Sequence, residues 1–582
     1  MLSRTITLAV IMALSLHANA QVLEKNFKVL GDGNPISSNV FCADPTALEY
    51  NGRLYVYGSN DSQQFIANGK KGENNYGEIK SIVVFSTDDM VNWTFHGTID
   101  TKRLCASWVT NPWYKGYGVS WAPSVTWRHN ESTGTDEFFL YFCNSSHGVG
   151  VLKAESPIGP WKSPNKELMI NYDTPGANKQ GTNANFDPGV TIDDNGVGWI
   201  TFGGLGPSTL MPEAARIVKL KPSMTEVDGT AVKIHAPYHF EANELNVIGG
   251  KYVYTYCSNW ASRSETAGEW NTYKAEHGIS LSAPETCTMC YMVSDNPEDP
   301  ESWVYKGVYG PHPGNGTNNN HSHLQKFQGR YYHLYHNAAM QESMKSAGVI
   351  DGSTGIFRSL CVNEAKVNEE TATINKVTTD LAGTDAIKAL NPYELQQAET
   401  MANSGGVNYE DFYNVQKNTK ISNLGNDASI NLYIEMANNA WTQVRNIDFG
   451  ASGAKSFILR AKGKGTIEIR KSKAGKPLTT LEFASDDFKD HVFEVDPSKY
   501  QGVQNLIFAF RVSDTENVQW DAWRFSEAEA SGISTVQHTP NTATQRFDLS
   551  GRRLNSTSAH RGIVIEQYQD ANGHKRSRKH IQ

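Results

Sequence analysis

The sequence is poor in cysteine and carries no excess of positive charge. Seven cysteines in 582 residues are too few for a disulfide framework. Cys287 and Cys290 have the spacing of a metal or redox pair, but no second pair accompanies them and their neighbours are typical of a strand. We therefore interpret them as buried core thiols. The formal net charge of −8 argues against nucleic acid as a partner.

Long apolar runs are also lacking. The longest, residues 6–16, is too short to span a bilayer, which takes about 20 apolar residues. It follows Arg4 and precedes Ala18-Asn19-Ala20, and this combination is typical of a cleaved secretory signal. The sequence therefore predicts a signal peptide over residues 1–20 and a secreted bacterial protein, periplasmic or extracellular, with no membrane span.

Helical periodicity is weak throughout, and a strand-like pattern recurs instead. Each copy has a turn followed by alternating aromatic and aliphatic residues. The spacing of the copies suits four-stranded blades with variable loops. The five copies occupy residues 51–60, 137–144, 196–204, 249–258 and 328–337. They predict a five-bladed β-propeller, whose radial closure protects strand edges. A stack of unrelated hairpins or a β-sandwich is the alternative.

The character of the sequence changes near residue 390, so we predict an all-β protein with two domains and a tail. Residues 21–390 would form the propeller, and residues 391–527 a β-sandwich of the jelly-roll type. Residues 528–582 are interpreted as a linker and C-terminal tail. The predicted sandwich strands include residues 456–461, 466–470, 491–495 and 505–510, and the tail contains a hairpin-like piece at 546–552 and a basic, solvated stretch at 574–580.

Aromatic residues and glycine are abundant, with 25 tyrosines, 13 tryptophans and 49 glycines. Such a surface suits sugars, because their apolar ring faces stack on aromatic side chains. Glycoside hydrolysis needs two carboxyl groups that face one cleft, one protonated and one ionised. In a propeller this cleft is the end of the central channel. Asp44, Asp187 and Glu241 fit, because each precedes a strand in apolar surroundings, although an Asp before Pro is also a common turn residue.

These three acids lie in motifs that resemble glycoside hydrolase family 43 over about residues 34–375. The motifs come in the family's order, one per blade: Ala43-Asp44-Pro45, Ser120-Trp121-Ala122-Pro123, Phe186-Asp187-Pro188, Phe240-Glu241-Ala242 and Asn319-Asn320-His321. The resemblance implies an inverting mechanism. It implies Asp44 as general base, Glu241 as general acid, and Asp187 as the residue that raises the pKa of the acid and orients it. Glu244 is a nearby rival for the acid.

The same resemblance implies residues that bind substrate or metal. His321 matches a channel histidine that contacts a central calcium through water, with His323 as the neighbouring alternative. Arg358 matches an arginine near the sugar, and its alternative is a solvated strand arginine. Trp121 would be a platform for a sugar ring, and core packing is the competing interpretation.

Residues 393–527 resemble carbohydrate-binding module family 6. The matching pieces are Gln397-Ala398-Glu399, residues 444–450 and residues 519–525. The resemblance implies Glu399 and Asp521 as ligands of a structural calcium, since oxygen ligands suit this hard cation. Tyr409 and Trp441 are candidates for stacking on a sugar. A domain that has lost binding and serves as a spacer is the alternative. No organic cofactor is expected.

The motifs and the second domain together predict a glycosidase that acts on a plant cell-wall polysaccharide. The leading hypothesis is an exo-acting or debranching α-L-arabinofuranosidase on arabinoxylan. A β-xylosidase or a bifunctional enzyme on xylan is the alternative, because xylose and arabinose are both pentoses. An endo-arabinanase on arabinan is a further alternative. A non-catalytic glycan-binding protein is the alternative of a different class, and retention of all three acids argues against it.

Overall fold

The computed structural model describes residues 22–68, 74–105, 119–314, 319–351, 356–407, 432–513 and 516–530, and the strands of the tail. The expected signal peptide and Tyr409 lie outside the described residues. The chain forms two compact units, Met1–Glu527 and Ala528–Gln582. Strands dominate both, so the predicted all-β class is confirmed. In the described part of the chain no helix combines the length and apolar character that a bilayer span requires.

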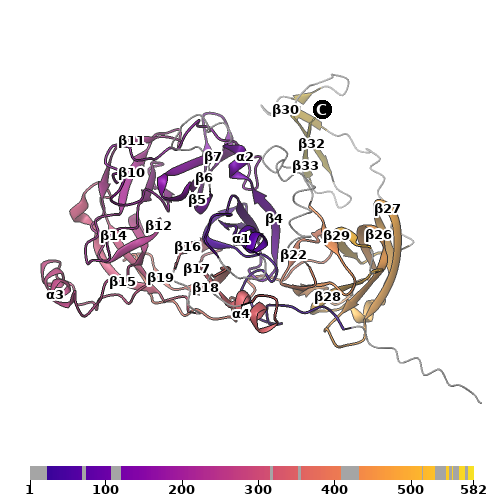
Figure 1. The fold of residues 1–582 in the computed structure, drawn as a ribbon. Helices are drawn as coiled ribbons and strands as arrows, with labels where there is room; N and C mark the ends of the chain where they lie inside the picture. The colour runs from indigo at the N-terminus through magenta and orange to yellow at the C-terminus, as the bar shows by residue number, and fades with distance from the viewer. Residues whose placement is uncertain are drawn as a thin grey trace, which may run out of the picture. The chain divides into compact units, whose positions relative to one another are not determined.

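Five antiparallel sheets form the blades of a propeller (Figure 1). Blade 1 has β1 (Ala43–Tyr50), β2 (Arg53–Ser59), β3 (Ile82–Thr87) and β4 (Trp93–Ile99), and blade 2 has β5 (Trp121–Asn130), β6 (Thr135–Cys143) and β7 (Val149–Ala154). Blade 3 has β8 (Gly189–Ile192), β9 (Gly198–Phe202), β10 (Arg216–Leu220) and β11 (Val227–Lys233), and blade 4 has β12 (His239–Ile248), β13 (Lys251–Ser258), β14 (Met289–Ser294) and β15 (Val304–Gly310). Blade 5 has β16 (Ser322–Phe327), β17 (Arg330–Asn337) and β18 (Ser359–Ala365).

The repeated pattern in the sequence is the second strand of each blade: β2, β6, β9, β13 and β17. These strands are buried on both faces, because each pair of neighbouring blades shares a hydrophobic cluster. In β6, for example, Phe138 and Leu140 pack toward blade 1 and Phe139 and Tyr141 toward blade 3. The first strands lie side by side around the ring, and β16 contacts β1. The propeller prediction is therefore confirmed, and the stack of unrelated hairpins is wrong.

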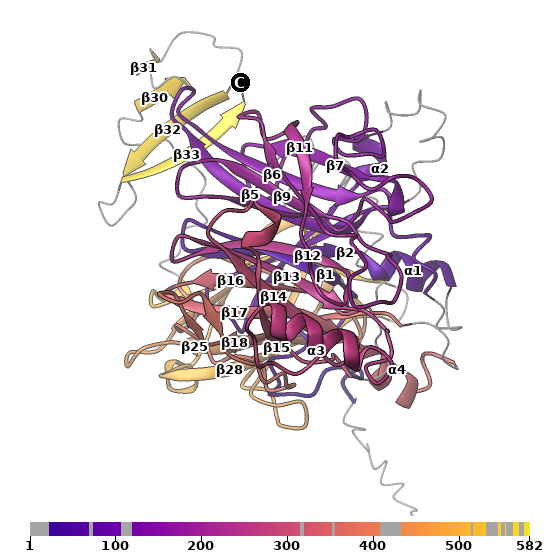
Figure 2. The same ribbon diagram turned by 90° about the vertical axis from the view of Figure 1, so that its left-hand side faces the viewer.

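Helices and short strands lie in the connections. They are α1 (Asp61–Asn68), α2 (Thr101–Leu104), α3 (Ala267–Glu276), α4 (Ala339–Ser346), β19 (Val367–Asn368) and β20 (Thr373–Ile374). Helices α1, α3 and α4 join strands within blades 1, 4 and 5, α2 follows blade 1, and the short hairpin of β19 and β20 follows blade 5. The longest of these helices, α3, covers the outer strands of blade 4 (Figure 2). Trp270 of α3 meets Tyr305 of β15 edge-on. All seven cysteines are buried, and for Cys287 and Cys290 this confirms the predicted core thiols.

Four of the blades place a residue with positive φ at the same point of the first strand. These residues are Asp44 (φ 48°), Ala122 (37°), Asp187 (50°) and Ala242 (64°). Side chains rarely adopt this conformation, which interrupts the regular strand and turns the backbone N–H toward the neighbouring blade. Three of these N–H groups bond to the end of the preceding blade's second strand: Asp44 to His336, Ala122 to Ser59 and Asp187 to Cys143. The bulges thereby bring residues of neighbouring blades together at one end of the ring.

The second domain is a curled sheet that forms both layers of a sandwich. Its strands are β21 (Gln396–Gln397), β23 (Asn403–Gly405), β24 (Ile434–Met436), β25 (Trp441–Asp448), β26 (Ser456–Arg470), β27 (Thr479–Glu494), β28 (Val503–Arg511) and β29 (Val518–Ser526). The predicted strands 456–461 and 466–470 are one strand, β26, because the chain passes Gly463 (φ 109°) as a bulge. The first part of β26 pairs with β29 and the second with β28, which curls the sheet.

The sandwich and the propeller share contacts within the first unit. Strand β22 (Thr400–Met401) pairs with β4 and becomes the fifth strand of blade 1. Asn92 exchanges two hydrogen bonds with the backbone of Arg445. A hydrophobic cluster runs from blades 1 and 5 into the sandwich without a break. These contacts explain why residues up to Glu527 form one compact unit although their sheets are distinct.

The second unit contains a four-stranded antiparallel sheet. Its strands are β30 (Gln545–Asp548), β31 (Arg553–Leu554), β32 (Ile563–Gln569) and β33 (Lys575–Ile581), in the order β31-β30-β32-β33. The hairpin-like piece corresponds to β30 and β31. The basic stretch, expected to be a solvated tail, instead forms β33. It pairs along β32, whose Ile563-Val564-Ile565 start is a strong strand former, and backbone pairing is indifferent to the charge of the side chains.

Candidate active site

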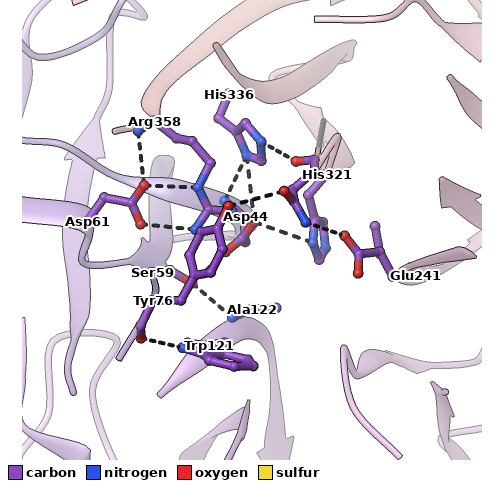
Figure 3. Close-up of polar contacts among 12 residues, drawn as sticks. Asp44, Ser59, Asp61, Tyr76, Trp121, Ala122, Glu241, His321, His336 and Arg358 are labelled. Carbon is purple, nitrogen blue, oxygen red and sulfur yellow. Dashed lines mark hydrogen bonds and ion pairs between the residues drawn. The ribbon is translucent and has the colours of Figure 1, made fainter. Parts of the chain in front are cut away.

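A pocket of about 220 Å³ lies where the first strands of the five blades begin. It contains the six propeller residues that the sequence favoured for catalysis, substrate or metal, but not their rivals Glu244 and His323. Its lining residues are Asp44, Tyr76, Trp121, Ala122, Phe186, Asp187, Leu205, Glu241, Asn319, His321 and Arg358. Each blade contributes, since Asp44 is in β1, Trp121 in β5 and Glu241 in β12, Asp187 lies two residues before β8, and His321 directly precedes β16. Figure 3 shows Asp44, Trp121, Glu241 and His321.

Asp44 is held as a carboxylate. Arg358 donates from Nη1 to Oδ1 at 2.6 Å, and Ser59 donates from Oγ to Oδ2 at 2.7 Å. Burial opposes ionisation, but the charge of Arg358, followed by His336, lowers the pKa of Asp44 below its ordinary value of 3.8. Asp44 is therefore ionised at neutral pH and can accept a proton.

Arg358 is fixed by a second carboxylate, Asp61, at the start of α1. Its Nε and Nη2 donate to the two oxygens of Asp61, each at 2.9 Å, and its backbone N–H also reaches Asp61 at 2.9 Å. Figure 3 shows the guanidinium between Asp61 and Asp44, with the ring of Tyr76 beside it at 5.2 Å. Arg358 lines the pocket, as expected of a residue near the sugar, and its guanidinium bonds to Asp44 through Nη1 and to Asp61 through Nε and Nη2.

Glu241 is held in the opposite protonation state. It is 7 % exposed, and its Oε1 accepts a hydrogen bond from Nδ2 of Asn319 at 3.0 Å. Burial, followed by repulsion from Asp187, raises the pKa of Glu241 well above its ordinary value. Asp187 therefore contributes to this shift as expected, but less than burial does. This shift favours the protonated form of Glu241, which can donate a proton.

Asp187 lies against the backbone next to Glu241. Its Oδ2 accepts the N–H of Ala242 at 2.9 Å, and the thiol of Cys143 lies 3.6 Å from Oδ1. Burial, followed by repulsion from Asp44, raises the pKa of Asp187 to about 7. The side chain thus fixes the bulge that carries Glu241, in agreement with an orienting role.

His321 lies between two of the acids. Its Nδ1 is 3.8 Å from Oδ1 of Asp44 and 4.0 Å from Oδ2 of Asp187. Burial lowers the pKa of His321 to about 4, so the ring is neutral at neutral pH. Its Nε2 has no hydrogen-bond partner among the described residues. No group of three His, Cys, Asp or Glu in that part of the chain is arranged to hold a metal directly. The free Nε2 fits a contact through water.

The two neighbours that rivalled the predicted residues pair with each other. Nδ1 of His323 lies 3.1 Å from Oε2 of Glu244, and neither residue lines the pocket. Glu244 is fully buried, and burial raises its pKa. This arrangement favours Glu241 and His321 as the residues that face a substrate.

Trp121 forms part of the pocket wall. It is half-buried, and its indole N–H donates to the carbonyl of Tyr76 at 3.0 Å. It also packs against a small cluster that includes Ala122 and Phe186. The two interpretations of Trp121, as a surface for sugar and as a packing residue, are therefore compatible.

Sequence reasoning gave no role to Ser59, Asp61, Tyr76, Asn319 or His336. One signal could have found two of them. The repeated strands end in a polar residue followed by Asn in four blades: Ser59-Asn60, Cys143-Asn144, Ser258-Asn259 and His336-Asn337. Three of these strand ends, His336, Ser59 and Cys143, accept hydrogen bonds from the N–H groups of the bulge residues Asp44, Ala122 and Asp187. Asp61, at the start of α1, and Tyr76, in the connection from α1 to β3, show no comparable pattern.

The sandwich brings its two predicted calcium ligands together. Glu399 is 3 % exposed and Asp521 is 5 % exposed, and the N–H of Ala398 donates to the carbonyl of Asp521 at 2.9 Å. Oε1 of Glu399 and Oδ1 of Asp521 have no hydrogen-bond partner within the described ranges. Asp521 also accepts from Arg460 at 2.7 Å. Two buried carboxyl groups with unpartnered oxygens fit a hard cation such as Ca²⁺.

Trp441 is not available to stack on a sugar. It is fully buried, and its indole N–H donates to the carbonyl of Glu24 at 2.8 Å. The ammonium of Lys473 lies 4.8 Å from the ring centre. The N-terminal segment therefore covers the ring, and the expectation that Trp441 stacks on a sugar is wrong.

Comparisons with known proteins agree with this geometry. Residues 33–369 match the model of glycosyl hydrolases family 43. The chain is 34 % identical over 523 residues to an arabinoxylan arabinofuranohydrolase of Paenibacillus polymyxa, covering 86 % of this chain and 75 % of the relative. It is 34 % identical over 517 residues to an arabinoxylan arabinofuranohydrolase of Bacillus subtilis (strain 168), covering 86 % and 93 %.

A solved structure covers both domains. It is the crystal structure of a glycoside hydrolase family 43 arabinoxylan arabinofuranohydrolase from Bacillus subtilis in complex with cellotetraose. The match has a TM-score of 0.72 and 32 % identity, and it covers 87 % of this chain and 99 % of that chain.

Proposed function

Because the chain belongs to glycosyl hydrolases family 43, we propose that it is an inverting α-L-arabinofuranosidase that removes arabinofuranose side groups from arabinoxylan. One observation carries the proposal: Asp44, ionised, and Glu241, protonated, line the same pocket. Inverting hydrolysis requires this pair of opposite protonation states.

In the proposed reaction Asp44 is the general base and Glu241 the general acid. Asp44 takes a proton from a water molecule, whose oxygen attacks the anomeric carbon on the face opposite the leaving group. Glu241 gives its proton to the glycosidic oxygen as the bond from that oxygen to the anomeric carbon breaks. One water is consumed, the sugar leaves with inverted configuration, and exchange of protons with solvent restores both carboxyl groups.

The remaining polar residues position this pair. Asp187 supports the bulge that follows Glu241 and disfavours ionisation of the acid. Arg358, fixed by Asp61, keeps Asp44 ionised. Trp121 and Arg358 form walls that a sugar ring would contact.

The size of the pocket and the nature of the relatives support the substrate. Ligand pockets typically measure about 300–1,000 Å³, so a volume of about 220 Å³ favours a single sugar unit over an internal stretch of a chain. Two relatives that span most of this chain are named arabinoxylan arabinofuranohydrolases. An arabinofuranose side group of arabinoxylan is a single sugar unit and is also the group that the names of these relatives indicate.

The test is the product profile on arabinoxylan, arabinan, linear xylan and xylo-oligosaccharides. We expect free arabinose from arabinoxylan and a xylan backbone of unchanged length. Release of xylose from the oligosaccharides would favour a β-xylosidase or a bifunctional enzyme. Shortened arabinan would favour an endo-arabinanase, and no released sugar would favour the non-catalytic alternative.

We also propose that the sandwich is a carbohydrate-binding-module-like domain in which Glu399 and Asp521 hold a structural Ca²⁺. Bound calcium would compensate the charge of two buried carboxylates. The continuous hydrophobic cluster supports a further role in stabilising the propeller. A water-mediated calcium contact at His321 and export by the signal at residues 1–20 complete the proposal, since a polymeric substrate lies outside the cell.

A further inference from the structure

Three apolar side chains lie together beside the mouth of the pocket. Trp260 is 39 % exposed and Leu205 is 47 % exposed. The ring of Trp260 stands edge-on to Phe240, with 4.4 Å between the ring centres. The N–H of Leu205 donates to the carbonyl of Phe240 at 3.0 Å, and Leu205 itself lines the pocket. The three residues are therefore continuous with the pocket wall, and we name them the rim platform.

The rim platform is held in place by the backbone on both sides. Asn259, directly before Trp260, donates from its side chain to the carbonyl of Thr209 at 2.9 Å and from its N–H to the carbonyl of Tyr238 at 2.7 Å. Leu205 has φ 55°, a conformation that leucine rarely adopts. A large apolar side chain in strained backbone at a pocket mouth is a reason to look for a function there.

The position of the rim platform relative to the acid indicates what it would contact. Phe240 directly precedes Glu241, the residue that protonates the leaving oxygen in the proposed reaction. The leaving group must lie on the side of the acid. In arabinoxylan the leaving group is the xylan main chain, a neutral polymer whose sugar rings have apolar faces. Such faces stack on tryptophan, and within the described residues Trp260 is the only tryptophan among the large exposed apolar side chains.

We propose that Trp260, supported by Phe240 and Leu205, binds a xylose residue of the main chain while the pocket holds the arabinofuranose side group. This inference rests on the proposed function and adds the binding site for the polymer. It makes Trp260 a residue that determines specificity for a polymeric over a small substrate.

The test compares two substrates of the same sugar, arabinoxylan and methyl α-L-arabinofuranoside, whose methyl group is too small to reach Trp260. For Trp260→Ala we expect kcat/KM on arabinoxylan to fall about tenfold, and kcat/KM on the methyl glycoside to stay within about twofold. Trp260→Phe, which keeps an aromatic ring, should retain most of the activity on the polymer. Val304→Ala truncates an equally exposed residue of the same blade and should change neither value.

A binding measurement separates failure of this inference from failure of the proposed function. In a Glu241→Gln background, calorimetry with linear xylotetraose should show affinity about tenfold weaker when Trp260→Ala is added. One outcome is that the parent releases arabinose while Trp260→Ala changes neither the ratio of kcat/KM on arabinoxylan to kcat/KM on the methyl glycoside nor the affinity for xylotetraose. In that case the role proposed for the rim platform is wrong. If the parent releases no arabinose while xylotetraose binding depends on Trp260, the proposed function is wrong and the rim platform stands. If Trp260→Ala loses its melting transition, the comparison shifts to Trp260→Leu, which keeps an apolar side chain but no aromatic ring and must then show the polymer-specific loss.

Discussion

Asn319 donates a hydrogen bond from its side-chain amide to Oε1 of Glu241 at 3.0 Å. An amide N–H donates to an oxygen without a proton, so the proton of the neutral acid lies on Oε2. The hydroxyl of Tyr76 donates to Oδ1 of Asn319 at 3.1 Å, which fixes the orientation of the amide. The backbone carbonyl of Asn319 also contacts Nε2 of His336, whose Nδ1 accepts the N–H of Asp44. Asn319 thus connects the proposed acid to the proposed base.

Asn319→Ala should move the alkaline limb of the pH profile. The bond from Asn319 favours the ionised form of Glu241 and lowers its pKa, so removal of the bond raises that pKa. Activity is lost when Glu241 loses its proton, so the alkaline limb of kcat/KM should move to higher pH. The loss of orientation should lower kcat about tenfold. Measurement of kcat/KM against pH for both proteins checks this, and a reduced kcat with an unmoved alkaline limb would contradict it.

Glu241→Gln and Asp44→Asn should differ in their dependence on the leaving group. 4-Nitrophenolate can leave as an anion and needs no proton from the acid. The xylan oxygen is a poor leaving group and must be protonated as the bond breaks. Glu241→Gln should therefore lose about 10³-fold in kcat on arabinoxylan and much less on the 4-nitrophenyl arabinofuranoside. Asp44→Asn should lose similar factors on both, because the water must be activated in each case. Glu244→Gln is the matched control. Its kcat should change by the same factor on arabinoxylan and on the 4-nitrophenyl arabinofuranoside.

Removal of Arg358 should move the acid limb of the kcat/KM pH profile to higher pH. Arg358 lowers the pKa of Asp44, so Arg358→Met raises it, and Asp44 becomes protonated at a higher pH. The acid limb of kcat/KM should therefore move to higher pH than in the parent. The single variant leaves Asp61 as a buried, unpaired carboxylate and should cost about 3–5 kcal/mol in the free energy of unfolding. Arg358→Met with Asp61→Leu removes both charges, should recover part of that stability, and should keep the shifted limb. An acid limb that stays in place would refute the role given to Arg358.

Calcium should stabilise the protein through the sandwich. A ligand at about 100 times its Kd adds about 2.7 kcal/mol to the stability of the folded state. We expect Ca²⁺ to raise Tm and a chelator to lower it, in differential scanning calorimetry. Glu399→Gln should abolish the calcium-dependent part of the shift. Asp490→Asn is the control, because Asp490 also contacts Arg460, at 3.3 Å. This variant leaves Glu399 and Asp521 unchanged and should respond to Ca²⁺ like the parent. Equal responses of all three proteins would refute the site.

The sequence predicted what depends on local pattern. The second strand of each blade has strong alternation because both of its faces are buried, and this pattern located β2, β6, β9, β13 and β17. The predicted acids were found because a carboxyl group in apolar surroundings is conspicuous. The predicted break between residues 461 and 466 was wrong, because the chain continues through a bulge as one strand, β26, and a bulge and a turn have similar local signals.

The partners of the acids could not be predicted, because closure of the ring brings them together from distant parts of the chain. Arg358 is 314 residues from Asp44 and 297 from Asp61 in sequence. Tyr76 reaches Asn319 across 243 residues. Trp441 was misinterpreted for the same reason, since the segment that covers it, at Glu24, is 417 residues away.

The central claim is that Asp44 and Glu241 act as base and acid in one displacement at a single pocket. Proton NMR of the first sugar released from an α-L-arabinofuranoside tests it most directly. The account predicts that β-L-arabinofuranose appears first and the α form only by later mutarotation. If the α anomer is the first product, two displacements have occurred, a carboxyl group has acted as nucleophile, and the assignment of Asp44 as a base toward water is contradicted.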